Sequence, residues 1–303
     1  ACVYPNLTTS QLQALDQGGT YASGAFDLTQ VSTTASGENV VESSIGGSFS
    51  QLTGFELSSA VSSTSVSVSG AYTVTTIGSC TVYQGTYTGT STSTTTAIGG
   101  GVSTALDAGT ITINGPTGSN ISNEALKETN NSYSLTLGES GITGLSNTPN
   151  GVIVAGTYTL AGAGGQSVGS FSTSISLSPL TVSGGLPTSV TESSPLTISW
   201  TGGNASDQVE IIGDSEVTSG SGATESITTG EFICTTTAGQ GSFTVPSAVL
   251  TLLPKTTSLP GSLGVLNAPA EVSFSPSLTS SSGSTVPSVF LGFTETASSV
   301  NYQ

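Results

Sequence analysis

The sequence has no histidine and no arginine, and its only basic side chains are Lys127 and Lys255. Hydrolases that use a serine or cysteine nucleophile need a base, usually histidine, to take the nucleophile's proton. Zinc sites are usually built from histidine together with cysteine. We therefore predict that the protein is not an enzyme, and we expect no catalytic residue and no cofactor.

Positive charge is scarce along the whole chain. The 2 basic side chains face 18 acidic ones, which gives a formal net charge of −16. Nucleic-acid-binding proteins neutralise phosphates with lysine and arginine, and peripheral membrane proteins use the same residues to bind anionic lipids. No apolar run approaches the roughly 18 to 20 residues that cross a bilayer. We expect no nucleic acid partner and no membrane insertion.

Methionine is also absent, although translation begins with it. We therefore expect a processed form whose N-terminal leader has been removed during export. Charged residues make up only 7% of the chain, against about 25% in an average soluble protein. Few lysines also mean few sites for trypsin-like proteases. These features favour a secreted, extracellular protein at the cell surface.

Alternating apolar residues fill most of the remaining sequence, and a period of two is typical of half-buried β-strands. Turn residues such as Asn114-Gly115-Pro116 and Pro149-Asn150-Gly151 separate these runs. The alternating sets include Val66, Val68, Tyr72 and Val74; Cys80 and Val82; Tyr133, Leu135 and Leu137; Tyr158 and Leu160; and Phe171, Ile175 and Leu177. The pattern predicts an all-β protein made of tandem antiparallel β-sandwich domains.

Changes in composition give the predicted domain boundaries. Low-complexity sequence runs from Thr90 to Gly101, and a stretch rich in glycine and proline follows Val182. We predict an N-terminal segment at 1–19, either a donor strand or an arm held by a disulfide, followed by sandwiches at 20–105, 106–181 and 182–303. The first two sandwiches could instead form one larger sandwich.

The last predicted domain has the clearest strand pattern. In LTISWTGG, the residues Leu196, Ile198 and Trp200 share one face, so Trp200 is predicted to mark the core. This strand, FICTTTAGQGSFTVPSAVLTLLP and LDAGTITINGPTGS resemble Ig-like domains of secreted surface proteins from acidobacterial-type soil bacteria. The resemblance implies Ig-like sandwiches in an extracellular setting and transfers no catalytic residue.

Three cysteines leave one without a partner inside the chain. A Cys2–Cys80 disulfide would join the N-terminal segment to the first sandwich and would stabilise it by about 4 kcal/mol on the loop-entropy model. The alternative is that both stay thiols. Cys234 has the same strand parity as Phe232, so we expect it to be buried as a small apolar side chain, with a link between subunits as the alternative.

Acidic residues are densest between Asp207 and Glu231. Clusters of this kind most often lie at a solvent-exposed loop edge and keep the protein soluble. The sequence does not determine whether the protein binds a metal. Calcium prefers carboxylate oxygens, and the candidate ligands are Asp207, Glu210, Asp214 and Glu216. Four sequons, Asn-x-Ser/Thr, are candidates for glycosylation, at Asn6, Asn120, Asn130 and Asn204.

These observations predict a structural subunit of a surface layer, pilus-like fibre or filament. Strand exchange and sheet edges would join its copies through main-chain hydrogen bonds, with Ala1–Gln17 and Val289–Gln303 as the candidate donor strands. We expect the main partner to be other copies of this chain. The alternative is a secreted adhesin or glycan-binding module that presents its loops to a sugar.

Overall fold

The computed structural model describes residues 20–35, 38–53, 70–88, 102–140, 153–221, 225–257, 259–269, 271–278 and 284–303. Across these ranges the regular secondary structure is almost entirely β-strand, as predicted. The two short helical pieces are a 3₁₀ turn, η2 (Ala238–Gln240), and one α-helical turn, α3 (Ser247–Leu250). The turn α3 begins directly after Pro246. Within the described ranges, no helix is long and apolar enough to span a membrane.

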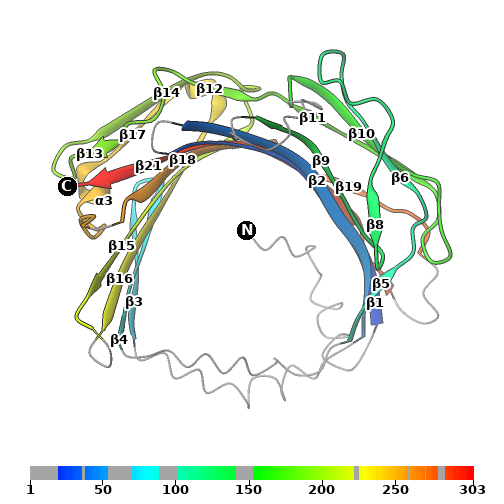
Figure 1. The fold of residues 1–303 in the computed structure, drawn as a ribbon, viewed down its shortest axis with the longest axis horizontal. Coiled ribbons are helices and arrows are strands. Elements are labelled where there is room, and N and C mark those ends of the chain that lie inside the picture. Colours follow the sequence, from blue (N-terminus) through cyan, green and yellow to red (C-terminus); the bar gives the residue numbers. More distant parts are fainter. Residues whose placement is uncertain are drawn as a thin grey trace.

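One 14-stranded sheet forms an arch through the whole molecule (Figure 1). Its main path is β3 (Gly70–Ile77), β4 (Cys80–Thr88), β16 (Ser226–Thr237), β15 (Gln208–Ser219), β18 (Gly261–Ala268), β21 (Ser288–Tyr302), β1 (Thr20–Ala35), β2 (Glu38–Thr53), β9 (Ser132–Ser140) and β8 (Lys127–Thr129). Four short strands pair beside this path: β5 (Val102–Leu106) with β2, β13 (Ser189–Val190) and β19 (Val272–Phe274) with β21, and β20 (Ser284–Thr285) with β1.

Two smaller sheets cover the convex side of the arch (Figure 1). The first has the order β11 (Phe171–Leu177), β10 (Gly156–Gly162), β6 (Ile111–Asn114) and β7 (Glu124–Ala125). The second has the order β12 (Leu180–Val182), β14 (Leu196–Gly202) and β17 (Ser242–Val245). The molecule is therefore two sandwiches that share one continuous sheet.

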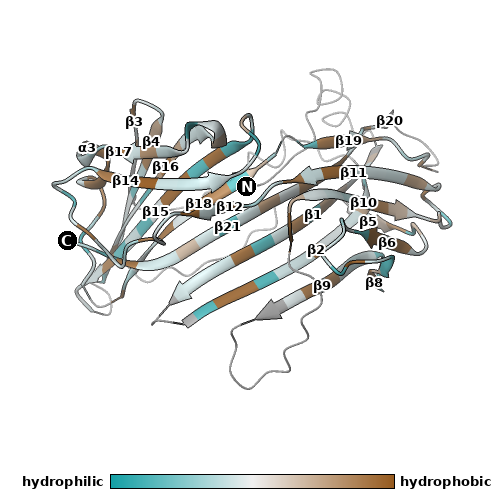
Figure 2. Cartoon of the chain, turned by 90° about the horizontal axis from the view of Figure 1, so that it is seen from above, coloured by the Kyte–Doolittle hydropathy of each residue, from teal (hydrophilic) through white to brown (hydrophobic). Residues whose placement is uncertain are grey.

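Each small sheet encloses a separate hydrophobic core against the large sheet. The first core includes Phe26, Phe49, Ile113, Tyr133, Tyr158, Ile175 and Phe290. The second includes Cys80, Val82, Trp200, Phe232, Cys234, Leu263 and Tyr302. Trp200 is only 3% exposed and its Nε1–H donates to the carbonyl of Ala238 at 3.0 Å, so the prediction of a core tryptophan is confirmed. In Figure 2 the apolar residues recur as bands along the strands, as alternation requires.

The strand pairing does not follow the predicted domain boundaries. Strand β4, from the segment 20–105, pairs with β16 of the segment 182–303, and β1 pairs in parallel with β21. The positions 105/106 and 181/182 therefore do not separate independent sheets. Long-range pairing of this kind carries no local sequence signal, because each strand shows the same alternation whatever its partner is.

The C-terminal strand β21 joins the two halves of the arch. It lies between β18 and β1, and its outer residues reach both cores, with Phe290 in the first and Tyr302 in the second. Val289–Gln303 is one of the two candidate donor strands from the sequence, and in the single chain it occupies a central position in its own sheet. The other predicted donor, Ala1–Gln17, lies outside the described residues.

Candidate interaction surface

The large sheet has two faces with different environments. Its outer face packs against the small sheets, and its inner face lines the concave side of the arch (Figure 1). Since side chains alternate along a strand, the residues next to a core residue point to the inner face. On β4 this places Cys80 and Val82 on the outer face, and Tyr83 and Tyr87 on the inner face.

The hairpin β3–β4 forms one end of the sheet. Its two-residue turn, Gly78-Ser79, lies between the paired residues Ile77 and Cys80, and Gly78 has a φ of 62°. Such a turn closes on a hydrogen-bonded pair, and bonded and non-bonded pairs then alternate along the ladder. The backbone N–H and C=O groups of Thr73 and Thr75 therefore point to β4, whereas those of Val74 and Thr76 point away from it.

The outward groups of β3 form an edge, because within the described ranges β3 pairs with β4 alone. Natural edge strands usually carry charges, prolines or bulges that prevent pairing with another molecule. From Gly70 to Thr88 the hairpin has no charged residue and no proline, and its register is continuous. The short strands β7 and β8, in contrast, carry Glu124, Lys127 and Glu128.

Exposed apolar side chains gather on the same hairpin. Val74 is 55% exposed and Tyr87 is 41% exposed, and both point to the inner face. Val74 lies directly opposite Tyr83. In the sequence Val74 belongs to the apolar parity of a strand that is expected to be half-buried, and in the structure this residue is exposed. The side chains do alternate as predicted. Val74, however, points to the inner face, which neither of the described small sheets covers.

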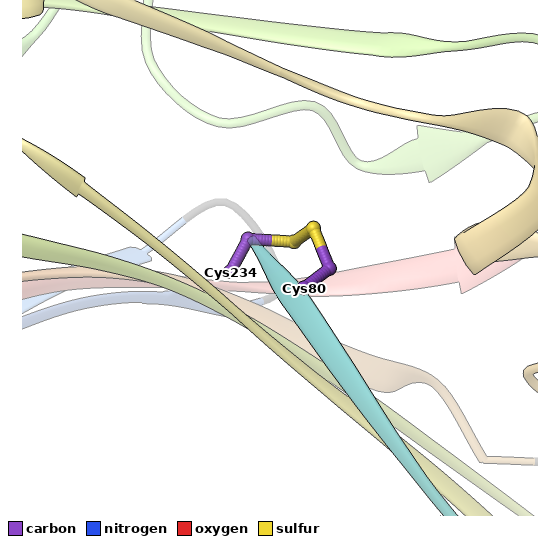
Figure 3. The surroundings of a disulfide bond; sticks show 2 residues. All are labelled: Cys80 and Cys234. Atoms are coloured by element: carbon purple, nitrogen blue, oxygen red, sulfur yellow. A yellow bond between two sulfur atoms is a disulfide. The ribbon is translucent and has the colours of Figure 1, made fainter. Parts of the chain in front are cut away.

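A disulfide fixes this hairpin to the rest of the sheet. Cys80 on β4 bonds to Cys234 on β16, a residue 154 positions away in the chain, and both side chains are buried (Figure 3). The two residues are directly opposite each other, with Cα atoms 3.9 Å apart, and the neighbouring N–H of Thr235 donates to the carbonyl of Ser79 at 3.0 Å. They therefore form a non-hydrogen-bonded pair, the position in which side chains come closest.

This bond corrects two predictions. Cys80 was assigned to Cys2, which lies outside the described residues, and Cys234 was expected to be an unpaired, inert thiol. Burial of Cys234 is confirmed, but as half of a disulfide. The signal was available in part, since Cys80 and Cys234 both share parity with core residues of their strands. Their opposition depends on the β4–β16 pairing, which the sequence does not reveal.

The predicted calcium ligands do not converge. Asp207 is buried, and its carboxylate accepts hydrogen bonds from the backbone N–H and the side-chain amide of Asn204, both at 3.0 Å. Glu210, Asp214 and Glu216 point instead to the inner face along β15. Within the described ranges, no group of three or more acidic or cysteine side chains could hold a metal ion. Asp207 therefore closes a turn, and the other three carboxylates belong to the concave surface.

The inner face is acidic over much of its width. Among the side chains that the structure describes, strand parity places these carboxylates on it: Asp27, Glu42, Glu210, Asp214, Glu216, Glu231 and Glu295. Asp214 and Glu231 are directly opposite each other, and Asp214 also accepts a hydrogen bond from the Ser262 hydroxyl. Burial raises the pKa of the Glu295 carboxyl. A second copy of the chain would be repelled by this part of the face, since like charges directly opposed are destabilising.

The sequons lie at turns. Asn120, Asn130 and Asn204 are exposed, and Asn120 and Asn130 have positive φ values of 58° and 53°. Asparagine tolerates this left-handed conformation better than most residues do, which gives it a structural reason to be there. Asn6 lies outside the described residues. Glycosylation at these positions stays a prediction.

No protein-family model matches the sequence, and a comparison with curated proteins gives no match either. The Ig-like resemblance therefore stays a prediction.

Proposed function

We propose that the protein is a structural subunit of an extracellular filament, pilus-like fibre or surface layer, and that its copies assemble through sheet edges. The observation that carries the proposal is the β3–β4 hairpin. Among the described strands its outer edge has no partner, and it has no charge and two exposed apolar side chains. An edge of this kind is a template for pairing with another chain.

Two further features support the proposal. The buried Cys80–Cys234 disulfide suits an oxidising compartment, where such bonds form and persist. The continuous sheet also suits a load-bearing subunit, because main-chain hydrogen bonds connect one end of the arch to the other. The proposal has no catalytic step and needs no cofactor.

A secreted adhesin or glycan-binding module is the second candidate. Exposed Tyr87 favours it, because an exposed aromatic ring can stack on a sugar. Tyr133 and Tyr158 are buried in the first core and cannot do so. Among the tyrosines whose side chains the structure describes, Tyr87 alone is strongly exposed. The edge is supported by backbone geometry, exposure and the absence of charge together.

Electron microscopy of native material tests the proposed function. We expect filaments, fibres or a two-dimensional layer whose repeating unit has the dimensions of one arch or of a small number of arches. A population of single particles at all concentrations would contradict the proposal and would favour the adhesin.

A further inference from the structure

We propose that β3 pairs antiparallel with β3 of a second copy, across a two-fold axis that passes beside Val74, so that the two large sheets become one. This inference names the partner of the edge described above, and it concerns one joint only. It can hold even if the assembly stops at a dimer and the proposed filament fails.

The outward backbone groups determine the register of this pair. The N–H and C=O groups of alternate residues, Val74 and Thr76 among them, point away from β4, and no other described strand pairs with them. A two-fold joint through these groups pairs Val74 with Val74 of the other copy, and this register keeps nearly the whole of Gly70–Ile77 in overlap. The two Val74 residues then exchange both of their hydrogen bonds.

The side chains agree with this register. Residues opposite each other in an antiparallel pair point to the same face, so the two Val74 side chains would meet on the inner face with their Cβ atoms about 5 Å apart. Val74 is 55% exposed in the single chain. Tyr83 lies directly opposite Val74 on β4, so the joint would place a tyrosine on each side of the valine pair. Apolar surface is thus removed from water where the backbones join.

This edge has no charged residue, so a second copy is repelled less here than at an edge of the large sheet that carries acidic residues. Each copy has a net charge of −16, so two copies repel each other unless they meet where carboxylates are remote. The nearest inner-face carboxylate in the row of Val74 is Glu231, two strands away. Two strands correspond to about 10 Å, and the two Glu231 residues would be about 24 Å apart in the dimer. The Debye length at physiological ionic strength is about 8 Å, so this repulsion is largely screened.

The disulfide supports the same joint. Cys80 begins β4 immediately after the hairpin turn, and its bond to Cys234 holds the hairpin on β16 in the free chain. An edge that is already ordered loses less conformational entropy when it binds. The hairpin is therefore preorganised for strand pairing in the free chain.

Sedimentation velocity of the full chain over a concentration series tests the proposal. The wild type is expected to dimerise or to assemble further, and to do so more strongly as salt screens the acidic copies. Val74→Pro removes the outward N–H and leaves the β3–β4 ladder intact, since residue 74 does not bond to β4. It is expected to raise Kd by about 30-fold, which corresponds to two lost hydrogen bonds. Val74→Ala keeps the N–H and is expected to weaken association less.

Cysteine cross-linking identifies the partner strand. In a Cys2→Ser background, Val74→Cys is expected to give a covalent dimer on mild oxidation, because the Cα atoms of a hydrogen-bonded antiparallel pair lie about 5.5 Å apart, within the range that a disulfide can span. Ser242→Cys on β17, also exposed and at the margin of a sheet, is the control and should stay monomeric. A wild type that is monomeric throughout, or association that Val74→Pro leaves unchanged, would overturn the inference. Filaments that persist in Val74→Pro without a Val74→Cys cross-link would overturn it and leave the proposed function standing.

Discussion

Replacing both Cys80 and Cys234 with alanine is expected to lower the free energy of unfolding by about 2 to 5 kcal/mol. The bond closes a loop of 154 residues, and on the loop-entropy model a closure of this length is worth about 5 kcal/mol. We expect the measured loss to be smaller than this value, because the hydrogen bonds between β4 and β16, which pair from Thr88 to Cys80, still hold the two strands together without the disulfide. Urea denaturation followed by fluorescence provides the measurement.

Cys2→Ser is the matched control for this experiment. It removes a cysteine without touching the Cys80–Cys234 bond, so we expect its unfolding free energy to stay within about 0.5 kcal/mol of the wild type. Peptide mapping under non-reducing conditions should recover Cys80 linked to Cys234. A peptide that links Cys80 to Cys2, or a double variant as stable as the wild type, would contradict the pairing.

Tyr302→Ala is expected to destabilise the second sandwich by about 3 to 5 kcal/mol, as for other large aromatic residues in a core. Tyr302 is fully buried near the end of β21, and its hydroxyl donates to the carbonyl of Ser262 at 2.7 Å. Burial raises the pKa of this hydroxyl. Gly213 and Gly261 leave room for the ring, because a Cβ at Gly213 would lie 2.4 Å from the Tyr302 hydroxyl and one at Gly261 would lie 3.0 Å from the ring.

The single tryptophan, Trp200, lies in the same core and reports its unfolding directly. Tyr302→Phe is the matched variant, since it keeps the ring and removes only the hydroxyl. We expect it to cost about 1 to 2 kcal/mol, from the hydrogen bond to Ser262. Equal effects of the two substitutions would show that the hydroxyl, rather than the packing of the ring, anchors the end of β21.

Local structure follows closely from the sequence. The strand around Leu196, Ile198 and Trp200 has the predicted faces, and the tyrosines at 133 and 158 are buried as their parity indicates. Each of these features depends on alternation within one strand and on one buried face. Alternation and a buried face can both be read from a strand without knowing its partner, so the sequence is sufficient to predict these features.

The arrangement of the strands does not follow from the sequence. The pairs β4–β16 and β1–β21 join segments that are more than a hundred residues apart in the chain. The alternation of apolar and polar residues along a strand does not show which other strand it pairs with. The incorrect disulfide and the exposed side of Val74 both have this origin. The edge itself did leave a signal, a strand of eight residues in a hairpin without charge, but only the topology shows that nothing else described pairs with it.

Residue-resolved amide hydrogen exchange over a range of protein concentrations tests the central claim most directly, namely that the open edge of β3 joins copies of the chain. The outward amides of Val74 and Thr76 should exchange rapidly in dilute protein and become protected as the concentration rises. The amides of Thr73 and Thr75, which bond to β4, should change much less and serve as the internal reference. Outward amides that exchange equally fast at every concentration, while the protein associates, would contradict the account.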